Sequence, residues 1–396
     1  MKLFIVAGEH SGDSLGAELM RELVELAQEP VRFEGIGGPR MQAQGLASLF
    51  EMQELSLMGL TEILPRLFSI RARIAQTTDA ILRAAPDALI TIDSPEFCLR
   101  VARRARAALP GLRTIHYVAP SVWAWRPGRA ARMARSIDHV LTLLPFEPPY
   151  MQAAGMSSDF VGHPVAAAAQ ADAAAAQRFR ARHAIAPDAP LVLALPGSRR
   201  GEISRHAGEF GRTLHLLHAR RPDLRVVVPT VRGLRAEVAA RCADWPGAPV
   251  ILDPDNADEP DEKAAAFAAA DAALAASGTV SLELAAAGVP MVVAYSLNRL
   301  NWELGRRLIH LDTVTLVNLV SETRAVPEHL GPHECRAERM APTLERVLSD
   351  PGERARQRAA MQLTLQRLGQ GQEAPGRRAA RSVLAHLGRR VARSSD

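Results

Sequence analysis

Short apolar runs alternate with longer, helix-like stretches along most of the chain. The runs cover residues 3–7, 32–36, 88–92, 114–118 and 140–144 in the first half, and 191–195, 225–228, 250–252, 272–275 and 290–294 in the second. Most of them are apolar on both faces and end close to a Gly, Ser, Asp or Pro. Such runs, separated by helices, are typical of buried strands in a parallel sheet made of βαβ units. The pattern therefore predicts an α/β protein.

The length and a shift in composition divide this pattern in two. A chain of 396 residues is long enough for two domains. Residues 166–176, directly after Gly162-His163-Pro164, are almost pure Ala and mark a joint. We expect an N-terminal domain over 1–165, a second over 166–340, and Arg-rich helices over 341–396 that pack back on the N-terminal domain. Each domain should hold a doubly wound, Rossmann-like sheet, with ligands at the carboxyl ends of the strands.

The composition indicates which ligands the protein is expected to bind and where in the cell it is expected to lie. The chain is 47% hydrophobic and 23% charged, which suits a globular protein with a core. Its net charge is +5, and most of its cationic residues are Arg. This modest excess of positive charge favours anionic ligands or an anionic membrane surface. The three cysteines lie far apart in the sequence, so we expect no disulfide framework. The expected location of the protein is therefore the reducing cytosol. No apolar stretch approaches the roughly 20 residues of a membrane-spanning helix, so membrane contact should be peripheral.

Two strand ends in the first half carry candidate bases. The loop after the first run is Gly8-Glu9-His10-Ser11-Gly12-Asp13, whose small residues let backbone approach a ligand. Its plainer interpretation is a strand–helix turn with Ser11 or Asp13 as the N-cap. Asp93 directly follows the run at 88–92, where a carboxylate can act as a general base. The alternative is that Asp93 caps the helix that begins near Pro95.

Two further segments of the first half are candidates for lipid or sugar contact. Residues 116–126 hold Trp123 and Trp125, which suit sugar faces or acyl chains but equally suit core packing. Arg126 opens a stripe of arginines at every third residue, which fits a solvated helix face or an anionic surface. Residues 55–68, which include Met58, are apolar with interspersed polar positions. That segment could receive acyl chains or be buried, and the sequence leaves both open.

In the second half, two strand ends predict an anion site. Ser198 and Arg199 follow the run at 191–195, where backbone amides and a guanidinium can hold an anion. The run at 272–275 leads into Ser277-Gly278-Thr279, whose amides would open the next helix and hold a diphosphate. Glu283 follows one helical turn later, where it could hold a ribose diol or merely favour the helix dipole.

The sequence contains no convincing motif for binding a metal ion or a dinucleotide. Asp253-Pro254-Asp255 is similar to an Asp-x-Asp metal site, but its Pro and its polar surroundings favour a solvated turn. No His/Cys cluster has the spacing of metal ligands, so we expect neither a metal nor a cofactor. An NAD dehydrogenase is disfavoured because no GxGxxG follows a strand.

Taken in order, the motifs resemble the lipid-A-disaccharide synthase family over about four fifths of the chain. The resemblance rests on residues 8–13, 38–41, 58–59, 93–97, 116–125, 144–147, 161–164, 195–199 and 277–279 with Glu283. It implies a GT-B fold, in which two Rossmann-like domains face across a cleft. It also implies an inverting glycosyltransferase of lipopolysaccharide synthesis that joins 2,3-diacylglucosamine, from its UDP form, to 2,3-diacylglucosamine 1-phosphate and releases UDP.

The resemblance further suggests roles and partners. We expect Asp93 to be the base, with Glu9 or His10 as the alternative. Donor binding is assigned to Arg199, Ser198, Ser277, Gly278, Thr279, Glu283 and Asn318, and acceptor or lipid binding to Met58, Trp123, Trp125 and Arg126. Expected partners are the two lipid substrates, a peripheral inner-membrane surface of a Gram-negative cell, and a second subunit that exchanges C-terminal segments; nucleic acid is not expected.

Two other functions share these motifs. A nucleotide-sugar epimerase would keep the donor site and need no lipid acceptor, and it would isomerise the UDP-sugar alone. A non-catalytic binding protein would bind the donor without forming a disaccharide.

Overall fold

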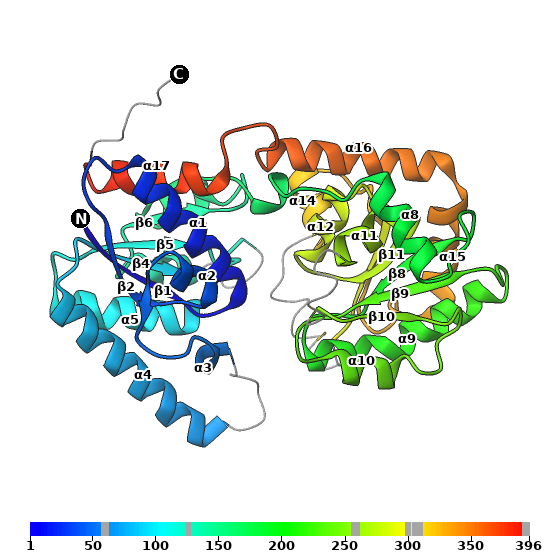
Figure 1. Ribbon diagram of the computed structural model, residues 1–396, viewed down its shortest axis with the longest axis horizontal. Coiled ribbons are helices and arrows are strands. Elements are labelled where there is room, and N and C mark those ends of the chain that lie inside the picture. The colour runs from blue at the N-terminus through cyan, green and yellow to red at the C-terminus, as the bar shows by residue number, and fades with distance from the viewer. Residues whose placement is uncertain (57–62, 124–127, 255–261, 298–301, 303–311, 390–396) are drawn as a thin grey trace. The chain divides into compact units, whose positions relative to one another are not determined.

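The computed structural model describes residues 1–56, 63–123, 128–254, 262–297, 302 and 312–389. The chain divides into two compact units (Figure 1). The N-terminal unit comprises residues 1–167 together with 371–396, and the C-terminal unit comprises 168–370. The segment expected as separate C-terminal helices, 341–396, is therefore shared between both units.

The N-terminal unit is built on a seven-stranded parallel sheet in the order β3-β2-β1-β4-β5-β6-β7. Its central strands are mostly apolar and are buried apart from the first residues of β1 and β5, as strands covered by helices on both faces are expected to be. The strands are β1 (Lys2–Ala7), β2 (Arg32–Ile36), β3 (Ala47–Ser48), β4 (Ala88–Ile92), β5 (Arg113–Tyr117), β6 (His139–Thr142) and β7 (Ser157–Phe160).

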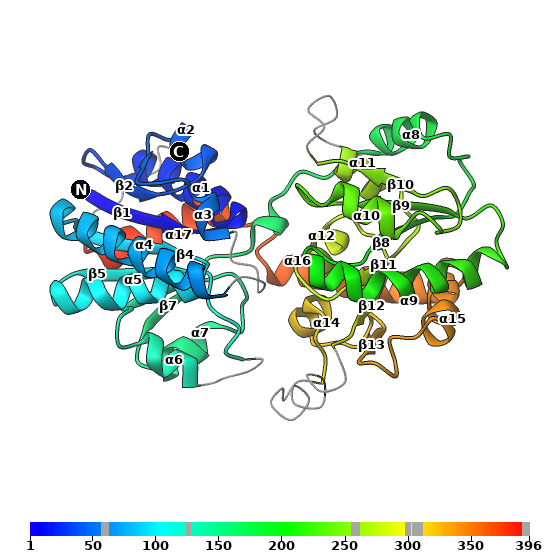
Figure 2. The same ribbon diagram turned by 90° about the horizontal axis from the view of Figure 1, so that it is seen from below.

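Helices cover both faces of this sheet. Helices α4 and α5 lie side by side on one face, whereas α1 and α17 pack together on the other (Figures 1 and 2). The helices of the unit are α1 (His10–Leu26), α2 (Pro39–Ala43), α3 (Gln53–Ser56), α4 (Ile63–Ala84), α5 (Pro95–Ala108), α6 (Gly128–Met133), α7 (Pro148–Ala153) and α17 (Pro375–His386), with a 3₁₀ turn at Pro164–Ala166.

Helix α17, from the far end of the chain, belongs to the N-terminal core. Its apolar side chains are buried with those of β1 and α1. Arg377 on its surface pairs with Glu22 and Glu25 of α1, at 3.1 and 3.2 Å. His139 of β6 bonds the Ser382 hydroxyl at 2.7 Å through Nε2, and this hydroxyl donates to Asp159 at 2.6 Å. Apolar burial and a partly buried polar network thus hold the C-terminal helix on the N-terminal unit.

We expect His139 to make this unit acid-sensitive. Burial, and then His386, lower the pKa of His139 to about 4, although Asp159 opposes the shift. The unfolded chain binds the proton near the ordinary pKa of about 6.5, so unfolding becomes more favourable as the pH falls from there toward 4. The contribution of this side chain is about 3 kcal/mol at pH 4.

Thermal unfolding followed from pH 7 to pH 4 measures this dependence. His139→Gln should flatten the loss of stability with acid, whereas His333→Gln, at an exposed position, should leave it unchanged. Equal acid responses of His139→Gln and the unmodified chain would contradict the assignment.

The C-terminal unit contains a six-stranded parallel sheet in the order β10-β9-β8-β11-β12-β13. Its strands are β8 (Leu191–Leu195), β9 (Arg225–Pro229), β10 (Val250–Leu252), β11 (Ala272–Ala276), β12 (Met291–Tyr295) and β13 (Glu328–Leu330). Its helices are α8 (Ala173–Arg182), α9 (Arg200–His218), α10 (Arg235–Arg241), α11 (Glu262–Ala269), α12 (Val280–Ala286), α14 (Leu316–Ser321), α15 (Ala337–Ser349) and α16 (Pro351–Arg367). Helices α9 and α15 pack together on one face, and α16 packs on α12 and α14 (Figure 2).

The prediction of an α/β chain with two doubly wound parallel sheets is confirmed. Each of the ten predicted runs overlaps a strand. The pattern missed β3, β7 and β13, which are short strands at or beside sheet edges. Both sheets bring the carboxyl ends of adjacent strands to one edge, where the candidate side chains are found.

Candidate functional site

The predicted donor residues meet in one pocket of the C-terminal unit. The pocket has a volume of about 360 Å³ and lies at the carboxyl ends of β8, β9 and β11. Among its lining residues are Ser198, Arg199, Ser277, Gly278, Thr279 and Glu283, together with Glu202, Thr230 and Lys263. Six of the seven predicted donor residues are therefore brought together by the fold.

The loop after β8 has a defined shape that Glu202 maintains. Gly197 has φ +139°, and a Cβ there would stand 2.4 Å from the Cβ of Glu202. Glu202, in the first turn of α9, accepts a hydrogen bond from the Ser198 amide at 3.0 Å and lies 3.5 Å from Arg199. The Arg199 side chain is 77% exposed, so its guanidinium remains accessible to a ligand. The loop thus presents a cation on a fixed backbone.

The loop after β11 supplies backbone donors. The amides of Gly278 and Thr279 donate no hydrogen bond within the described part of the chain. Gly278 has φ +157° with open space around its Cβ position, so the conformation rather than crowding favours glycine there. Helix α12 has only seven residues, and we therefore attribute anion binding to these amides rather than to a helix dipole.

Glu283 and Lys263 form an ion pair on the pocket wall. Glu283 lies in the first turn of α12 and Lys263 in the first turn of α11. Both side chains are about half exposed, so solvent screens their attraction and the pair can open for a ligand. Lys263 was not predicted from the sequence. The available signal was that it is one of only two lysines in a chain that otherwise uses arginine.

Asn318 does not reach this pocket. It lies on α14, is completely buried, and donates from Nδ2 to the carbonyl of Val326 at 2.9 Å. Its Oδ1 accepts from the Val326 amide at 3.0 Å. The amide side chain therefore ties α14 to the segment before β13, which corrects the expected contact with nucleotide or phosphate.

A second group of candidates lies at the carboxyl edge of the N-terminal sheet. Strands β1 and β4 are neighbours, with Ala7 opposite Ile92, so the loops after them adjoin. The half-buried Asp93 accepts hydrogen bonds from the Ser94 amide at 2.8 Å and from the Ser11 hydroxyl at 3.3 Å. Its carboxylate is thus oriented by two donors but keeps acceptor capacity.

The backbone at this edge is strained. Asp93 and Ser94 have φ values of 53° and 41°, and Val118, after the adjacent β5, has φ 79°. Left-handed conformations are uncommon for such residues, and for the β-branched Val118 this one is a genuine outlier. Strain of this kind concentrates at functional sites and supports a functional role for the loops around Asp93.

The helix caps differ from the sequence expectation. Helix α1 has Glu9 as its N-cap residue and begins at His10, so neither Ser11 nor Asp13 is the cap. The buried Asp13 instead accepts hydrogen bonds from the amides of Gly38, Arg40 and Met41, at 2.8 to 3.0 Å, and so anchors the start of α2. Asp93 does not cap α5, because Ser94 is its N-cap residue and no side chain caps that helix. Glu9 and His10 remain exposed beside Asp93.

The predicted acceptor residues are only partly described. Trp123 donates from Nε1 to Glu147 at 3.2 Å and packs edge-to-face on Phe146, with ring centroids 5.1 Å apart. Burial raises the pKa of Glu147 to about 7, against the hydrogen bonds from Leu144 and Trp123. This pairing holds Trp123 in place, and its contact with an acceptor stays a prediction. Met58, Trp125 and Arg126 lie outside the described residues.

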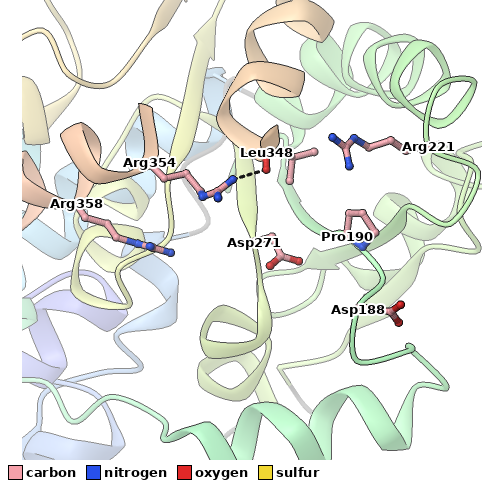
Figure 3. A pocket seen from close by; sticks show the side chains of 7 residues that line it. All are labelled: Asp188, Pro190, Arg221, Asp271, Leu348, Arg354 and Arg358. Carbon is pink, nitrogen blue, oxygen red and sulfur yellow. Dashed lines mark hydrogen bonds between the residues drawn. The ribbon is translucent and has the colours of Figure 1, made fainter. Parts of the chain in front are cut away.

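A larger cavity of about 450 Å³ lies elsewhere on the C-terminal unit (Figure 3). It is lined by Asp188 and Asp271 as well as by Arg221, Arg354 and Arg358, so its charges largely balance. Arg354 donates to the carbonyl of Leu348, and Asp271 is held by Arg180 and by the Leu191 amide. Internal bonds thus occupy these two side chains, at the amino ends of the strands and away from the pocket that holds Arg199 and Glu283.

The described ranges contain neither a metal cluster nor a membrane-spanning helix. Among these residues no three His, Cys, Asp or Glu side chains are grouped to hold a metal ion. Nor does any helix in the described part of the chain have the length and apolar character needed to cross a membrane.

Solved structures with a similar architecture include an epimerase and a glycosyltransferase. The chain is similar to the UDP-GlcNAc 2-epimerase from Neisseria meningitidis bound to UDP-GlcNAc, with a TM-score of 0.65, 12% identity and coverage of 98% of this chain and 99% of that one. It is also similar to CalG4, the calicheamicin glycosyltransferase, with a TM-score of 0.53, 18% identity and 98% coverage of both chains. At these identities the likeness shows the GT-B fold alone.

Sequence relatives decide the family. A family model described as lipid-A-disaccharide synthetase matches residues 3–383. The lipid-A-disaccharide synthase of Ruegeria pomeroyi is 56% identical over 390 residues, covering 98% of this chain and 96% of the relative. That of Rhodospirillum centenum is 49% identical over 389 residues, covering 98% and 95%. The chain therefore belongs to the lipid-A-disaccharide synthase family, and is a UDP-sugar-dependent glycosyltransferase of lipid A synthesis.

Proposed function

We propose that the chain transfers 2,3-diacylglucosamine from its UDP donor to the 6-hydroxyl of 2,3-diacylglucosamine 1-phosphate, with inversion at the anomeric carbon. The observation that carries the proposal is the gathering of Arg199, Glu283 and the Ser277–Thr279 loop in one pocket. A cation, free amides and a carboxylate are what a diphosphate joined to a ribose requires.

In the proposed donor complex, the diphosphate lies against the free amides of Gly278 and Thr279 and against Arg199. Lys263 turns from Glu283 toward the phosphate oxygens, and Glu283 then accepts hydrogen bonds from the ribose diol. This exchange of partners keeps both charged groups paired during binding. Ser198 orients the phosphates from the loop after β8, whose amide Glu202 holds in place.

The proposed chemistry is a single displacement. The acceptor 6-hydroxyl forms the new bond to the donor anomeric carbon while the bond to the diphosphate breaks and UDP leaves. Asp93 takes the hydroxyl proton, with Glu9 or His10 as the alternative base. The negative charge that develops on the diphosphate is stabilised by Arg199 and the loop amides, at about 3–4 kcal/mol for a key donor.

The proposal includes a peripheral location on the cytoplasmic face of the inner membrane, because both substrates carry acyl chains. Vesicle sedimentation tests this part separately from catalysis. Exchange of C-terminal segments in a homodimer would require α17 to leave the contacts with α1 and β6 of its own chain. A mass that stays monomeric in light scattering would exclude this exchange.

Mass spectrometry of the reaction products tests the proposed function. With both substrates, a disaccharide 1-phosphate should appear in equal amount to UDP. With the UDP-sugar alone, an isomerised sugar would indicate an epimerase instead. Donor binding without any disaccharide would indicate a binding protein.

Replacement of Glu283 tests the ribose assignment. We expect Glu283→Ala to weaken UDP binding about 10- to 100-fold, because hydrogen bonds to a charged partner contribute about 1.5–3 kcal/mol. Isothermal calorimetry with UDP measures this change, and Glu334→Ala, on the same unit but outside the pocket, serves as control. Unchanged UDP affinity in Glu283→Ala would remove Glu283 from the donor site.

A further inference from the structure

A basic groove lies between α5 and α6 on the N-terminal unit. Its volume is about 310 Å³. Its charged lining consists of Arg100 and Arg103 from α5, Arg129 and Arg132 from α6, and the single carboxylate of Glu96. On each helix the two arginines are three residues apart, so both point from the same face. The groove therefore gathers four guanidinium groups around one acid.

The charges of the groove do not cancel. Glu96 lies 2.8 Å from Arg129 and 3.5 Å from Arg100, and this one carboxylate serves both guanidinium groups. Arg103 and Arg132 have no acidic or carbonyl partner among the described residues. Guanidinium groups held together without counter-charges attract an anion, and their planar forks match the oxygens of a phosphate.

The position of the groove connects it with the proposed base. Helix α5 begins at Pro95, directly after Asp93 and Ser94, and both Pro95 and Glu96 line the groove. The groove thus begins directly after the strained loop that carries Asp93 and continues along the first turns of α5. An anion bound there would lie on the helix that follows Asp93 in the chain.

We propose that this groove binds the phosphate monoester of the sugar acceptor. The inference rests on the proposed function and names the part of that substrate which the N-terminal unit recognises. A phosphate monoester carries a charge of about −1.5 to −2 near neutral pH, which matches the two unpaired guanidinium groups. The carbon that bears the phosphate and the carbon that bears the hydroxymethyl group are both bonded to the ring oxygen, so holding the phosphate orients the 6-hydroxyl for attack.

Kinetics with two acceptors test the proposal. One acceptor is 2,3-diacylglucosamine 1-phosphate and the other is the same lipid without its phosphate. We expect Arg132→Ala and Arg103→Ala each to raise KM for the phosphorylated acceptor about 10-fold. Neither variant should change KM for the donor or the rate with the dephosphorylated acceptor. Arg104→Ala, an exposed arginine of α5 outside the groove, should behave like the unmodified enzyme.

An anionic phospholipid headgroup presents the same phosphate chemistry, and binding to phosphatidylglycerol vesicles distinguishes this source. Groove variants that bind such vesicles normally, but discriminate less between the two acceptors, support the proposal. Variants that lose vesicle binding and keep full discrimination overturn it in favour of a headgroup site. An equal loss of activity with both acceptors overturns it as well.

The two proposals fail in different ways. If the unmodified enzyme forms no disaccharide from either acceptor, the proposed function fails and the groove assignment falls with it. If that enzyme forms the disaccharide and prefers the phosphorylated acceptor, but Arg103→Ala and Arg132→Ala keep this preference, only the groove assignment is overturned.

Discussion

Asp93→Asn is expected to lower kcat by about 10²–10⁴-fold, the range that general-base catalysis contributes. The substitution keeps the shape of the side chain but removes its ability to accept the hydroxyl proton. Asn also tolerates the left-handed backbone of this position, where φ is 53°. The fold should therefore persist, and the loss should appear in kcat while the affinity for UDP is unchanged. Single-turnover release of UDP, with acceptor present, measures it.

Two comparisons make this result specific to Asp93. Ser11→Ala removes one hydrogen bond to the carboxylate and should cost far less than Asp93→Asn, since the Ser94 amide still orients the group. The turnover of Glu9→Gln and of His10→Asn tests whether either residue is the base instead. Near-native turnover of Asp93→Asn, together with a large loss in one of these variants, would move the base to that residue.

Arg199→Ala should reduce kcat by about 10²–10³-fold, because loss of one key donor to a developing negative charge has an effect of that size. Arg200, its neighbour, offers a matched control. It is similarly exposed and belongs to the same helix start, but it pairs with Glu237 and does not line the pocket. Arg200→Ala should therefore retain nearly full activity.

Steady-state rates measured with saturating acceptor compare Arg199→Ala with Arg200→Ala. Arg199→Lys keeps the charge without the planar fork and should recover part of the lost rate. If Arg199→Ala and Arg200→Ala lose activity equally, a general effect of positive charge on this surface would replace the specific role of Arg199.

The apolar pattern predicted the architecture well because most strands are buried on both faces. Strands β8 and β11 are buried at every position, so their sequences are continuous apolar runs. The strands that the pattern missed are not buried on both faces along their whole length, so they need not be continuous apolar runs. Strand β7, Ser157–Phe160, has polar residues at three of its four positions, and β13 has only three residues; both lie at sheet edges.

The pocket proposed to bind the donor was largely predictable because its residues follow strands directly. Parallel strands bring their carboxyl ends to one edge, so the loops after β8 and β11 were expected at the same edge, and the pairing of these two strands makes the loops adjoin. Lys263 comes instead from the start of α11, and its pairing with Glu283 depends on how that helix packs.

Hydrogen bonds to the protein's own backbone explain the remaining differences from the sequence expectations. Asp13 was expected as a helix cap, whereas its carboxylate accepts from backbone amides 25 to 28 residues away. Asn318 was expected at the nucleotide, whereas it bonds the backbone of Val326. A polar side chain has the same sequence signature in both roles, and only the fold decides whether backbone or ligand is its partner.

A structure of the chain with UDP bound would locate the proposed donor site. We expect the diphosphate within hydrogen-bond distance of the Gly278 and Thr279 amides and of the Arg199 guanidinium, with the ribose hydroxyls at Glu283. UDP bound at another place, with the pocket between the β8 and β11 loops closed, would contradict this expectation.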